Sequence, residues 1–420
     1  MDARSNDMIN PPTDPASVAE AVSPLDALAL FGGAPAFVEP LHVGRPNIGN
    51  RARFLEQVGE ILDRRWLTNS GPVVRELEAR VAELLGVRHC LAICNGTVAL
   101  EIAAKVLGLS GEVIVPSFTF VATAHALEFQ GITPVFCDID PVTHNIDPGA
   151  IEALITPRTT GIVGVHTWGR PCDTQALQQI AERHGLRLMF DAAHAFACSD
   201  RGTMIGNFGD LEVLSFHATK FLNSLEGGAI VTNDDDIARQ VALMRNFGFA
   251  GYDDVVSVGT NGKMNEICAA MGLSNLEEID AIIDVNRRNY DRYRERISEI
   301  PGLSVAEYDA TERSNFQYVV VEVDAAVTGV DRDAIVRVLQ AENVLARRYF
   351  YPACHNMEPY RSRMPGGDAL LPQTAALVTR VMSLPNGTSV DEAAVDRIAG
   401  LLALIVANGA EATRRIAERA

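Results

Sequence analysis

The chain has 420 residues, of which 47% are hydrophobic and 21% charged, and it carries a net charge of −18 at pH 7. This length and apolar content are typical of a globular protein with two or three domain-sized units. The negative charge disfavours extended contact with nucleic acid or an anionic membrane, because such contacts depend on clustered Lys and Arg. A small anionic substrate remains compatible with that charge, since local donors outweigh distant, screened charges.

The N-terminal segment has no feature of a secretion signal. Residues 1–26 are expected to form a disordered leader, because the stretch is polar, acidic and proline-containing and lacks a basic start and an apolar core. Apolar runs elsewhere, such as 399–407, fall short of the roughly 20 residues that cross a bilayer. Seven scattered cysteines without a Cys-x-x-Cys pair favour a reducing compartment. We therefore expect a cytoplasmic protein.

Short apolar runs alternate with amphipathic stretches from about residue 90 to 235, as in a mostly parallel sheet covered by helices. The predicted strands are 112–116, 133–138, 161–166, 187–191, 211–216 and 228–232. The predicted helices are 97–108, 119–130, 148–155 and 173–184. We expect residues 27–275 to form this large domain, with its ligand beyond the carboxyl ends of the strands.

The remaining chain, 276–420, is expected to form a smaller α+β domain. A helical stretch at 265–299 looks like its connector, because charged residues alternate there with apolar residues at helical spacing. The further predicted elements are a strand at 315–323, a helix at 331–342, an extended run at 344–352, a surface loop at 364–372 and a terminal helix at 390–417.

Polar residues follow two of the predicted strands. Asp191 closes one of them, and Ser215, His217 and Lys220 come at the end of another, ahead of the glycine pair 227–228. A lone lysine is usually a solvated charge and a lone aspartate a helix cap. Between an apolar strand and a glycine pair, however, Lys220 is expected to be buried, which would lower its pKa and make it a nucleophile.

This set of residues meets the requirements of pyridoxal 5′-phosphate (PLP), which needs a lysine for covalent attachment, a carboxylate for the pyridinium nitrogen and donors for the phosphate. Asp191 lies 29 positions before Lys220, so the two can converge from different strands at one sheet edge. Gly96 and Thr97 open a predicted helix, whose free N–H groups can bind an anion, although a simple N-cap is an equally good interpretation of that segment alone. Ser215 is a further candidate donor.

An aromatic cover for the cofactor ring could come from Phe118 or Phe120, and the sequence pattern does not choose between them. Phenylalanines are usually core residues.

Taken together, the motifs SFHATK (215–220), DAAHA (191–195), PSFTFVATA (116–124), CDIDP (137–141) and HTWGRPCD (166–173) resemble the DegT/DnrJ/EryC1/StrS family of PLP-dependent sugar aminotransferases. The resemblance runs from about residue 31 to the C-terminus. It implies PLP fold type I, the α/β fold of aspartate aminotransferase. It also implies roles for seven residues: Lys220 as PLP anchor and general acid/base, Asp191 at the pyridinium nitrogen, Gly96, Thr97 and Ser215 at the phosphate, Phe120 against the ring, and His194, often Gln in relatives, near its phenolic oxygen.

The resemblance further implies a homodimer with active sites at the interface. Asn261 matches a family Asn that reaches the phosphate of the neighbouring subunit. Gly262 and Lys263 depart from the Asn-Tyr-Arg-Met form common in relatives.

Within the family, the segments GGAPAF (32–37), VGRPN (43–47), NFGF (246–249) and RRYFYPACH (347–355) are similar to members that aminate C4 of dTDP-4-keto-6-deoxy-D-glucose with L-glutamate as donor in deoxysugar biosynthesis, for an antibiotic or a glycan. Family members that aminate C3 of a dTDP-3-keto-6-deoxyhexose share most of these motifs, so that alternative stays open.

Three other classes compete with this interpretation. The related sugar dehydratases carry His in place of the anchoring lysine, so Lys220 argues against them. A nicotinamide-dependent enzyme is disfavoured because no G-x-G-x-x-G follows the first predicted strand. A non-catalytic PLP-binding regulator is disfavoured by the intact set of chemical residues.

Some other polar and aromatic residues have ordinary structural interpretations. His166 and Trp168 could line a pocket, but core packing is at least as good an explanation. Surface ion pairing is the default for Arg347, Arg348 and Tyr349, although they could meet a nucleotide diphosphate. Asp138 and Asp140 look like turn and cap residues, and no metal is expected.

Overall fold

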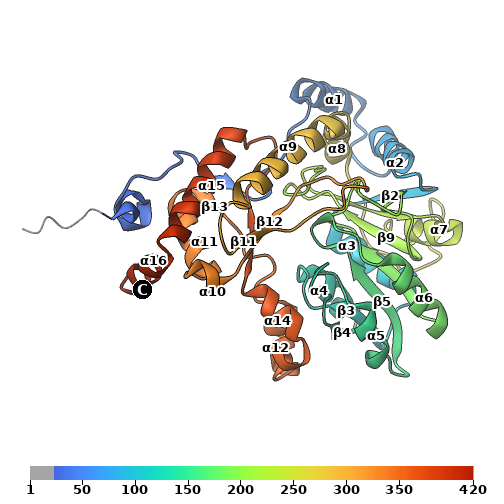
Figure 1. Ribbon diagram of the computed structural model, residues 1–420. Helices are drawn as coiled ribbons and strands as arrows, with labels where there is room; N and C mark the ends of the chain where they lie inside the picture. Colours follow the sequence, from blue (N-terminus) through green and yellow to red (C-terminus); the bar gives the residue numbers. More distant parts are fainter. Residues whose placement is uncertain (1–22, 420) are drawn as a thin grey trace, which may run out of the picture.

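The computed structural model describes residues 23–419, so most of the expected leader lies outside the described residues. Figure 1 shows two units side by side, a large α/β unit and a smaller unit formed mainly by the C-terminal chain.

The large unit is built on a seven-stranded sheet with the order β2-β10-β9-β6-β5-β3-β4. All neighbouring pairs from β9 to β4 are parallel, and β10 is antiparallel to both β9 and β2. The strands are β2 (His89–Ile93), β3 (Glu112–Pro116), β4 (Thr133–Cys137), β5 (Thr159–Val165), β6 (Arg187–Asp191), β9 (Leu211–Ser215) and β10 (Gly228–Thr232). The expected α/β class and mostly parallel sheet are confirmed.

The inner strands are apolar over nearly their whole length because helices cover both faces of the sheet. Every residue of β3, β9 and β10 is buried. The carboxyl ends of β2, β3, β5, β6 and β9 all reach one edge, since β10 is the single reversed strand. The sequence did not predict β2, whose HCLAI run is short and holds a single β-branched residue.

One face of the sheet packs against α3, α4 and α7, and the other against α5, α6, α2 and α8. These helices are α2 (Pro72–Leu85), α3 (Gly96–Val106), α4 (Ala122–Phe129), α5 (Pro148–Ile151), α6 (Thr174–His184), α7 (Asp235–Met244) and α8 (Glu266–Leu276), with the short η3 (Glu152–Leu154) extending α5 and α1 (Arg51–Arg64) lying outside α8. Side chains accept hydrogen bonds at several N-termini: Asn95 caps α3 and Asp173 caps α6.

The second unit has a three-stranded antiparallel sheet of β11 (Leu303–Val305), β12 (Val319–Val323) and β14 (Val381–Leu384). Its core also includes side chains of α9 (Ile279–Ile297), α11 (Arg332–Ala341), α15 (Glu392–Ala407) and α16 (Gly409–Ala417). A short parallel pair joins β1 (Leu41–His42) to β13 (Val344–Leu345). The remaining short elements are η1 (Pro24–Ala27), η2 (Ala29–Phe31), η4 (Thr167–Gly169), β7 (Ser199–Asp200), β8 (Thr203–Met204), α10 (Ala325–Thr328), η5 (Cys354–Asn356), α12 (Tyr360–Arg363), α13 (Gly367–Leu370) and α14 (Pro372–Val378).

The unit boundaries differ from those expected in two places. Leu25, Leu28 and Phe31 are buried in the core of the second unit, so residues 23–26 are not part of a leader and the chain just after them does not belong to the large domain. Conversely, Cys354 and Tyr360 pack into the core of the large unit. In both places, apolar side chains of one segment pack on an apolar face of the other unit. Neither segment is marked in the sequence by the composition of a linker.

Several expected elements differ in extent from the observed ones. The helical stretch 265–299 forms two helices. α8 packs into the core of the large unit, whereas the C-terminal half of α9 packs into the core of the second unit. The terminal helix bends by 84° between α15 and α16. The loop 364–372 contains the helical turn of α13, and strand pairing begins only at Val319.

Among the described residues, no single helix is long and apolar enough to cross a membrane. The bent pair α15–α16 passes the same test of length and composition when its two helices are taken together.

Candidate active site

A cavity of about 850 Å³ lies at the carboxyl edge of the large sheet. Seven of the eight residues predicted from the sequence line it, namely Gly96, Thr97, Phe120, Asp191, His194, Ser215 and Lys220. They arrive from the ends of β2, β3, β6 and β9, so the shared edge of the sheet brings them together.

Lys220 is the single lysine of this cavity. The chain has three lysines, of which Lys105 is exposed on α3 and Lys263 lies with its ammonium 4.6 Å from the centre of the Phe247 ring. The surrounding protein removes hydration and lowers the pKa of Lys220 from 10.5 to about 8, while the negative charge of Asp191 acts in the opposite direction. The neutral amine therefore reaches half of the population near pH 8, whereas free lysine reaches it only near 10.5.

The turn that carries Lys220 is held from two sides. Its own backbone N–H donates to the carbonyl of His217 at 2.8 Å, and Gln317 Nε2 donates to the carbonyl of Thr219 at 2.8 Å. Gly44 lies against the same turn so closely that a Cβ there would sit 2.9 Å from the Thr219 carbonyl oxygen. Segments around Gly44 and Gln317, far apart in the sequence, thus pack against the turn that carries the lysine.

Asp191 is oriented by two hydrogen bonds. Thr123 Oγ1 donates to its Oδ2 at 2.8 Å, and the backbone N–H of Ala193 donates to its Oδ1 at 3.1 Å. Thr123 lies 3.0 Å from the hydroxyl of Thr119, which lines the cavity. Thr123 was not predicted as a site residue, although it lies inside the PSFTFVATA motif.

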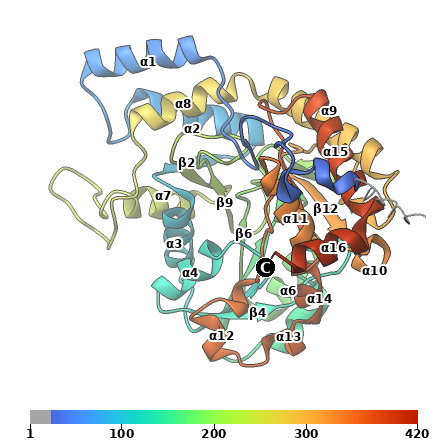
Figure 2. The ribbon, with the colours of Figure 1, turned by 90° about the vertical axis from the view of Figure 1, so that its left-hand side faces the viewer.

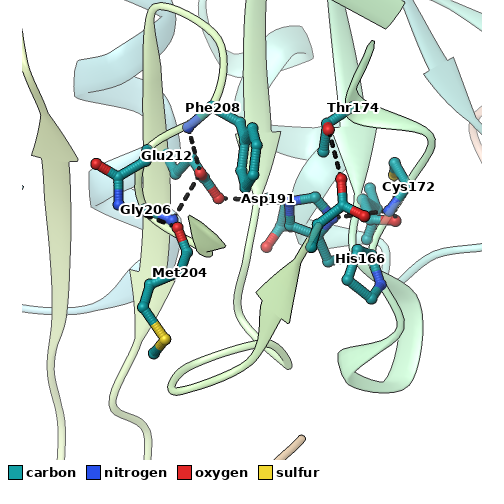
Figure 3. Close-up of polar contacts among 12 residues, drawn as sticks. His166, Cys172, Thr174, Asp191, Met204, Gly206, Phe208 and Glu212 are labelled. Carbon is teal, nitrogen blue, oxygen red and sulfur yellow. Dashed lines mark hydrogen bonds and ion pairs between the residues drawn. The ribbon is translucent and has the colours of Figure 1, made fainter. Parts of the chain in front are cut away.

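A buried polar network supports Asp191 from behind (Figure 3). The His166 N–H donates to the Asp191 carbonyl at 3.1 Å, and the Cys172 N–H donates to His166 Nδ1 at 3.0 Å. His166 Nε2 lies 3.3 Å from Glu212 Oε2, while Glu212 Oε1 accepts from the Gly206 and Phe208 amides at 2.6 and 2.8 Å. His166 and Trp168 are buried and do not line the cavity, so their role is core packing.

The N-terminus of α3 also lines the cavity. Asn95 caps the helix through the Val98 amide at 2.8 Å, while the amides of Gly96 and Thr97 make no hydrogen bond within the described chain. A Cβ on Gly96 would lie 3.1 Å from Ser215 Cβ, so glycine allows this close approach. Two free amides and the hydroxyls of Thr97 and Ser215 make a cradle for an anion.

The structure distinguishes the two phenylalanines that the sequence left open. Phe118 is fully buried, with its ring 5.3 Å from Trp168 and 5.5 Å from Phe350. Phe120 is 56% exposed and lines the cavity. Phe118 is therefore a core residue, and Phe120 is available to a ligand.

His194 has a defined tautomer. The Trp168 N–H donates to its Nδ1 at 3.2 Å, so Nδ1 carries no proton and Nε2 carries one. Burial, together with the positive charge of Lys220, lowers the pKa of His194 well below its usual value. The imidazole ring is also stacked on the Phe350 ring, with 5.8 Å between the two ring centres. His194 is thus a neutral, fixed side chain that can donate from Nε2.

Asn261 is the one predicted site residue that does not line the cavity. It is exposed, and its backbone forms an isolated bridge with Asn246. Asp138 and Asp140 form the expected caps: Asp138 accepts from the Gln373 and Thr374 amides at the start of α14, and Asp140 accepts from those of Val142 and Thr143.

The segment after β13 contributes Arg347, Tyr349 and Phe350 to the cavity wall. For Arg347 and Tyr349, surface ion pairing is the default expectation from the sequence and contact with a nucleotide diphosphate the alternative. Ser117 Oγ lies 2.7 Å from His355 Nδ1, and His355 Nε2 lies 2.8 Å from Asp368 Oδ1. Because the carboxylate accepts from Nε2–H, Nδ1 accepts from the Ser117 hydroxyl. The Cys354 amide also donates to the Ser117 carbonyl at 3.0 Å. These residue types match a hydrolase triad, but Ser117 and His355 are fully buried, so the contacts serve to hold the 117–120 loop.

Comparison with known proteins agrees with this arrangement. The cavity and the sheet are those of an aminotransferase of PLP fold type I. The model of the DegT/DnrJ/EryC1/StrS aminotransferase family matches residues 49–403, and the chain belongs to that family. The expected family, fold and enzyme class are confirmed.

Three relatives are similar over most of their length. The dTDP-4-amino-4,6-dideoxy-D-glucose transaminase of Shigella dysenteriae is 42% identical over 325 residues, which are 77% of this chain and 88% of that protein. The Escherichia coli protein of the same name is 35% identical over 363 residues, which are 86% of this chain and 97% of that protein. DesI, whose crystal structure was determined in the presence of its TDP-sugar product, is 51% identical in sequence to this chain. The match covers 93% of this chain and 99% of the DesI chain, and the two structures superpose with a TM-score of 0.89.

Proposed function

We propose that this aminotransferase carries PLP on Lys220 and transfers an amino group from L-glutamate to C4 of dTDP-4-keto-6-deoxy-D-glucose, giving dTDP-4-amino-4,6-dideoxy-D-glucose. The observation that carries the proposal is that the one lysine of the cavity lies with an oriented carboxylate and an anion cradle at one sheet edge. The names of the two transaminase relatives and the TDP-sugar product of DesI support the substrate.

The cavity residues fit PLP in chemistry and placement. The Gly96 and Thr97 amides at the helix N-terminus suit a phosphate dianion, and a Cβ at Gly96 would press on Ser215. Asp191 is a buried carboxylate suited to a protonated ring nitrogen, and Phe120 offers an aromatic face. Bound there, PLP would supply an electron sink for the carbon from which a proton is removed.

The chain's own residues would then manage the protons. Lys220, neutral in a large fraction near pH 8, takes the proton from the α-carbon of glutamate and delivers a proton to C4 of the sugar in the second half-reaction. Asp191 would keep a proton on the ring nitrogen of PLP, and His194, with its proton on Nε2, could donate a hydrogen bond to the phenolic oxygen. His194 would therefore act as a neutral hydrogen-bond donor, as the Gln found at this position in many relatives can.

A homodimer would complete each site. Figure 2 shows α1 and the 245–262 loop projecting on the same side of the molecule. Large apolar side chains are exposed in both places: Leu55 and Leu62 on α1, with Trp66 just after it, and Phe247, Tyr252 and Val258 on the loop. Exposed apolar surface of this kind is typical of an interface. Asn261, at the base of this loop and outside its own cavity, would reach the phosphate in the partner subunit.

Complementation tests the shared site. Lys220→Ala and Asn261→Ala proteins, each impaired, are mixed, unfolded and refolded together. A hybrid dimer then holds one intact site, so we expect activity to rise toward about a quarter of wild type for random pairing of two subunits. Activity that remains at the level of the separate variants would argue against a site built from both subunits.

The substrate is tested with dTDP-4-keto-6-deoxyglucose and its 3-keto isomer, each incubated with PLP-loaded protein and glutamate. Product NMR should show nitrogen on C4. Amination of the 3-keto isomer alone would reject the proposed regiochemistry. Formation of pyridoxamine phosphate from glutamate separates an enzyme from a PLP-binding regulator, because a regulator would leave PLP unchanged.

A further inference from the structure

Two adjacent arginines of the cavity wall have different surroundings. Arg348 pairs with Asp333 at 3.1 Å, and its guanidinium lies 4.6 Å from the centre of the Tyr351 ring. Arg347 has no carboxylate within ion-pair distance among residues 23–419, and its guanidinium makes no hydrogen bond there; it lies 5.2 Å from the centre of the Tyr349 ring. Most arginines among residues 23–419 are ion-paired, so the guanidinium of Arg347 is unusual in being left available to a ligand of the cavity.

The backbone of Arg347 is rigidly placed. Its N–H donates to the Ser383 carbonyl at 3.0 Å, and the Ser383 N–H donates back at 2.7 Å. This two-way bridge ties the wall to β14, so the guanidinium projects from a fixed base. A fixed base reduces the conformational entropy lost when the side chain binds an anion.

The lining of the cavity around Arg347 is predominantly basic. His42, Arg45 and His217 line the same cavity, and Arg45 also has no carboxylate partner in the described chain. The acidic lining residues are Asp191, which is engaged by Thr123, and Glu226, whose Oε1 lies 3.6 Å from His217. In a protein with a net charge of −18, this local field attracts an anion.

Arg347 also stands where two spaces meet. It lines the main cavity and a neighbouring chamber of about 360 Å³, together with Thr119, Phe120 and Tyr349. Lys220 and Asp191 line the main cavity and not the chamber, so the chamber is the end away from the chemistry. A long ligand with one end at Lys220 would pass Arg347 before it reaches the chamber.

We propose that Arg347 binds the diphosphate of the nucleotide-linked sugar and thereby selects that substrate; this rests on the proposed function. The order of chemical groups along such a ligand, sugar, diphosphate and nucleoside, matches the order of Lys220, Arg347 and the chamber. The forked guanidinium matches phosphate oxygens in geometry, and the neighbouring Tyr349 ring limits its hydration.

The test is calorimetric binding of dTDP to PLP-loaded wild type, Arg347→Gln, Arg347→Lys and the control Arg361→Gln, because Arg361 pairs with Glu358 on the surface and lines neither the cavity nor the chamber. We expect Arg347→Gln to bind dTDP about 10- to 100-fold more weakly, the loss typical of a charge-assisted hydrogen bond. Arg347→Lys should recover part of the affinity, because it keeps the charge but not the fork. Arg361→Gln should stay within about threefold, as for the loss of a surface ion pair.

A second arm measures pyridoxamine phosphate formation from glutamate in a single turnover, where Arg347→Gln should stay within about threefold of wild type because no diphosphate takes part. Unchanged dTDP affinity in Arg347→Gln, an equal loss in Arg361→Gln, or no dTDP binding by wild type would overturn the assignment. An equal loss with glutamate would assign Arg347 to the donor carboxylate instead. Because dTDP binding needs no turnover, failure to aminate the 4-keto sugar would remove the proposed function while leaving this result readable.

Discussion

The floor and the wall of the cavity are built in different ways. The floor, with Asp191, Ser215 and Lys220, consists of residues at or just after the carboxyl ends of parallel strands within one sheet. The wall, with Arg347, Tyr349 and Phe350, comes from more than a hundred positions later. The residues that follow it, Cys354 and His355, form hydrogen bonds with the 117–119 loop. In the proposed function, the floor would carry proton transfer, and the wall would carry substrate selection. Substitutions in the two regions should fail in different ways.

The largest effect is expected at the floor, for Lys220→Ala. Without the amine there is neither covalent attachment of PLP nor a group to move the proton, so turnover and the visible absorption of the attached cofactor should both be abolished. Lys105→Ala, on the exposed face of α3, is the matched control and should behave as wild type. Retained turnover in the Lys220 variant would remove the lysine from the mechanism.

Asp191→Asn should come next. The amide keeps the shape of the side chain and can keep the Ala193 contact, but it no longer stabilises a proton on the ring nitrogen. We expect both half-reactions to slow by about a hundredfold or more, as for removal of a preorganised charged group, with PLP still bound. Stopped-flow absorbance with glutamate, and then with the keto sugar, measures the two half-reactions separately. Near-normal rates in both would rule out the proposed role.

The pH at which PLP attaches to the apoprotein should report the lowered pKa of Lys220. Attachment needs the neutral amine, whose fraction rises as pH increases through the pKa, so the rate should rise with a midpoint near 8 and not near 10.5. Since the charge of Asp191 raises this pKa, Asp191→Asn should move the midpoint to lower pH. A midpoint at the value of free lysine would contradict the buried environment.

A smaller effect is expected just after the wall, from the contacts of His355. His355→Leu leaves the Ser117 hydroxyl and the Asp368 carboxylate without this partner, and Ser117→Ala removes the group that Nδ1 accepts from. Each should cost about 1–3 kcal/mol of stability, and the double variant should cost less than the sum. The visible circular dichroism of bound PLP should fall in both, because the loop carries Phe120. Additive stability losses with unchanged dichroism would mean that the loop is positioned without these contacts.

Much of the floor could be predicted from sequence, for a physical reason. Buried parallel strands are apolar and stop at polar residues, so Asp191 and Lys220 stand out against their neighbours. Phe118 and Phe120 could not be separated, because both follow β3 in a turn whose direction is set by packing on Trp168 and Phe350. His355 had no signal of its own, since its partners Ser117 and Asp368 come from distant segments.

The boundaries of the two units were predicted less well. Leu25 and Phe31 lie far in sequence from the core they join, and neither composition nor periodicity indicates such a long-range contact. The division of 265–299 into α8 and α9 was missed for a related reason: both halves are helical, and only the identity of the core that each one faces separates them.

The central claim is that Lys220 is the attachment site of PLP, and the scarcity of lysine makes it directly testable. Borohydride reduction of the PLP-loaded protein fixes the lysine–cofactor bond, and peptide mass spectrometry then locates the phosphopyridoxyl group among the three lysines of the chain. We expect the modification on Lys220 alone. Modification of Lys105 or Lys263 with Lys220 unmodified would contradict the account of the active site.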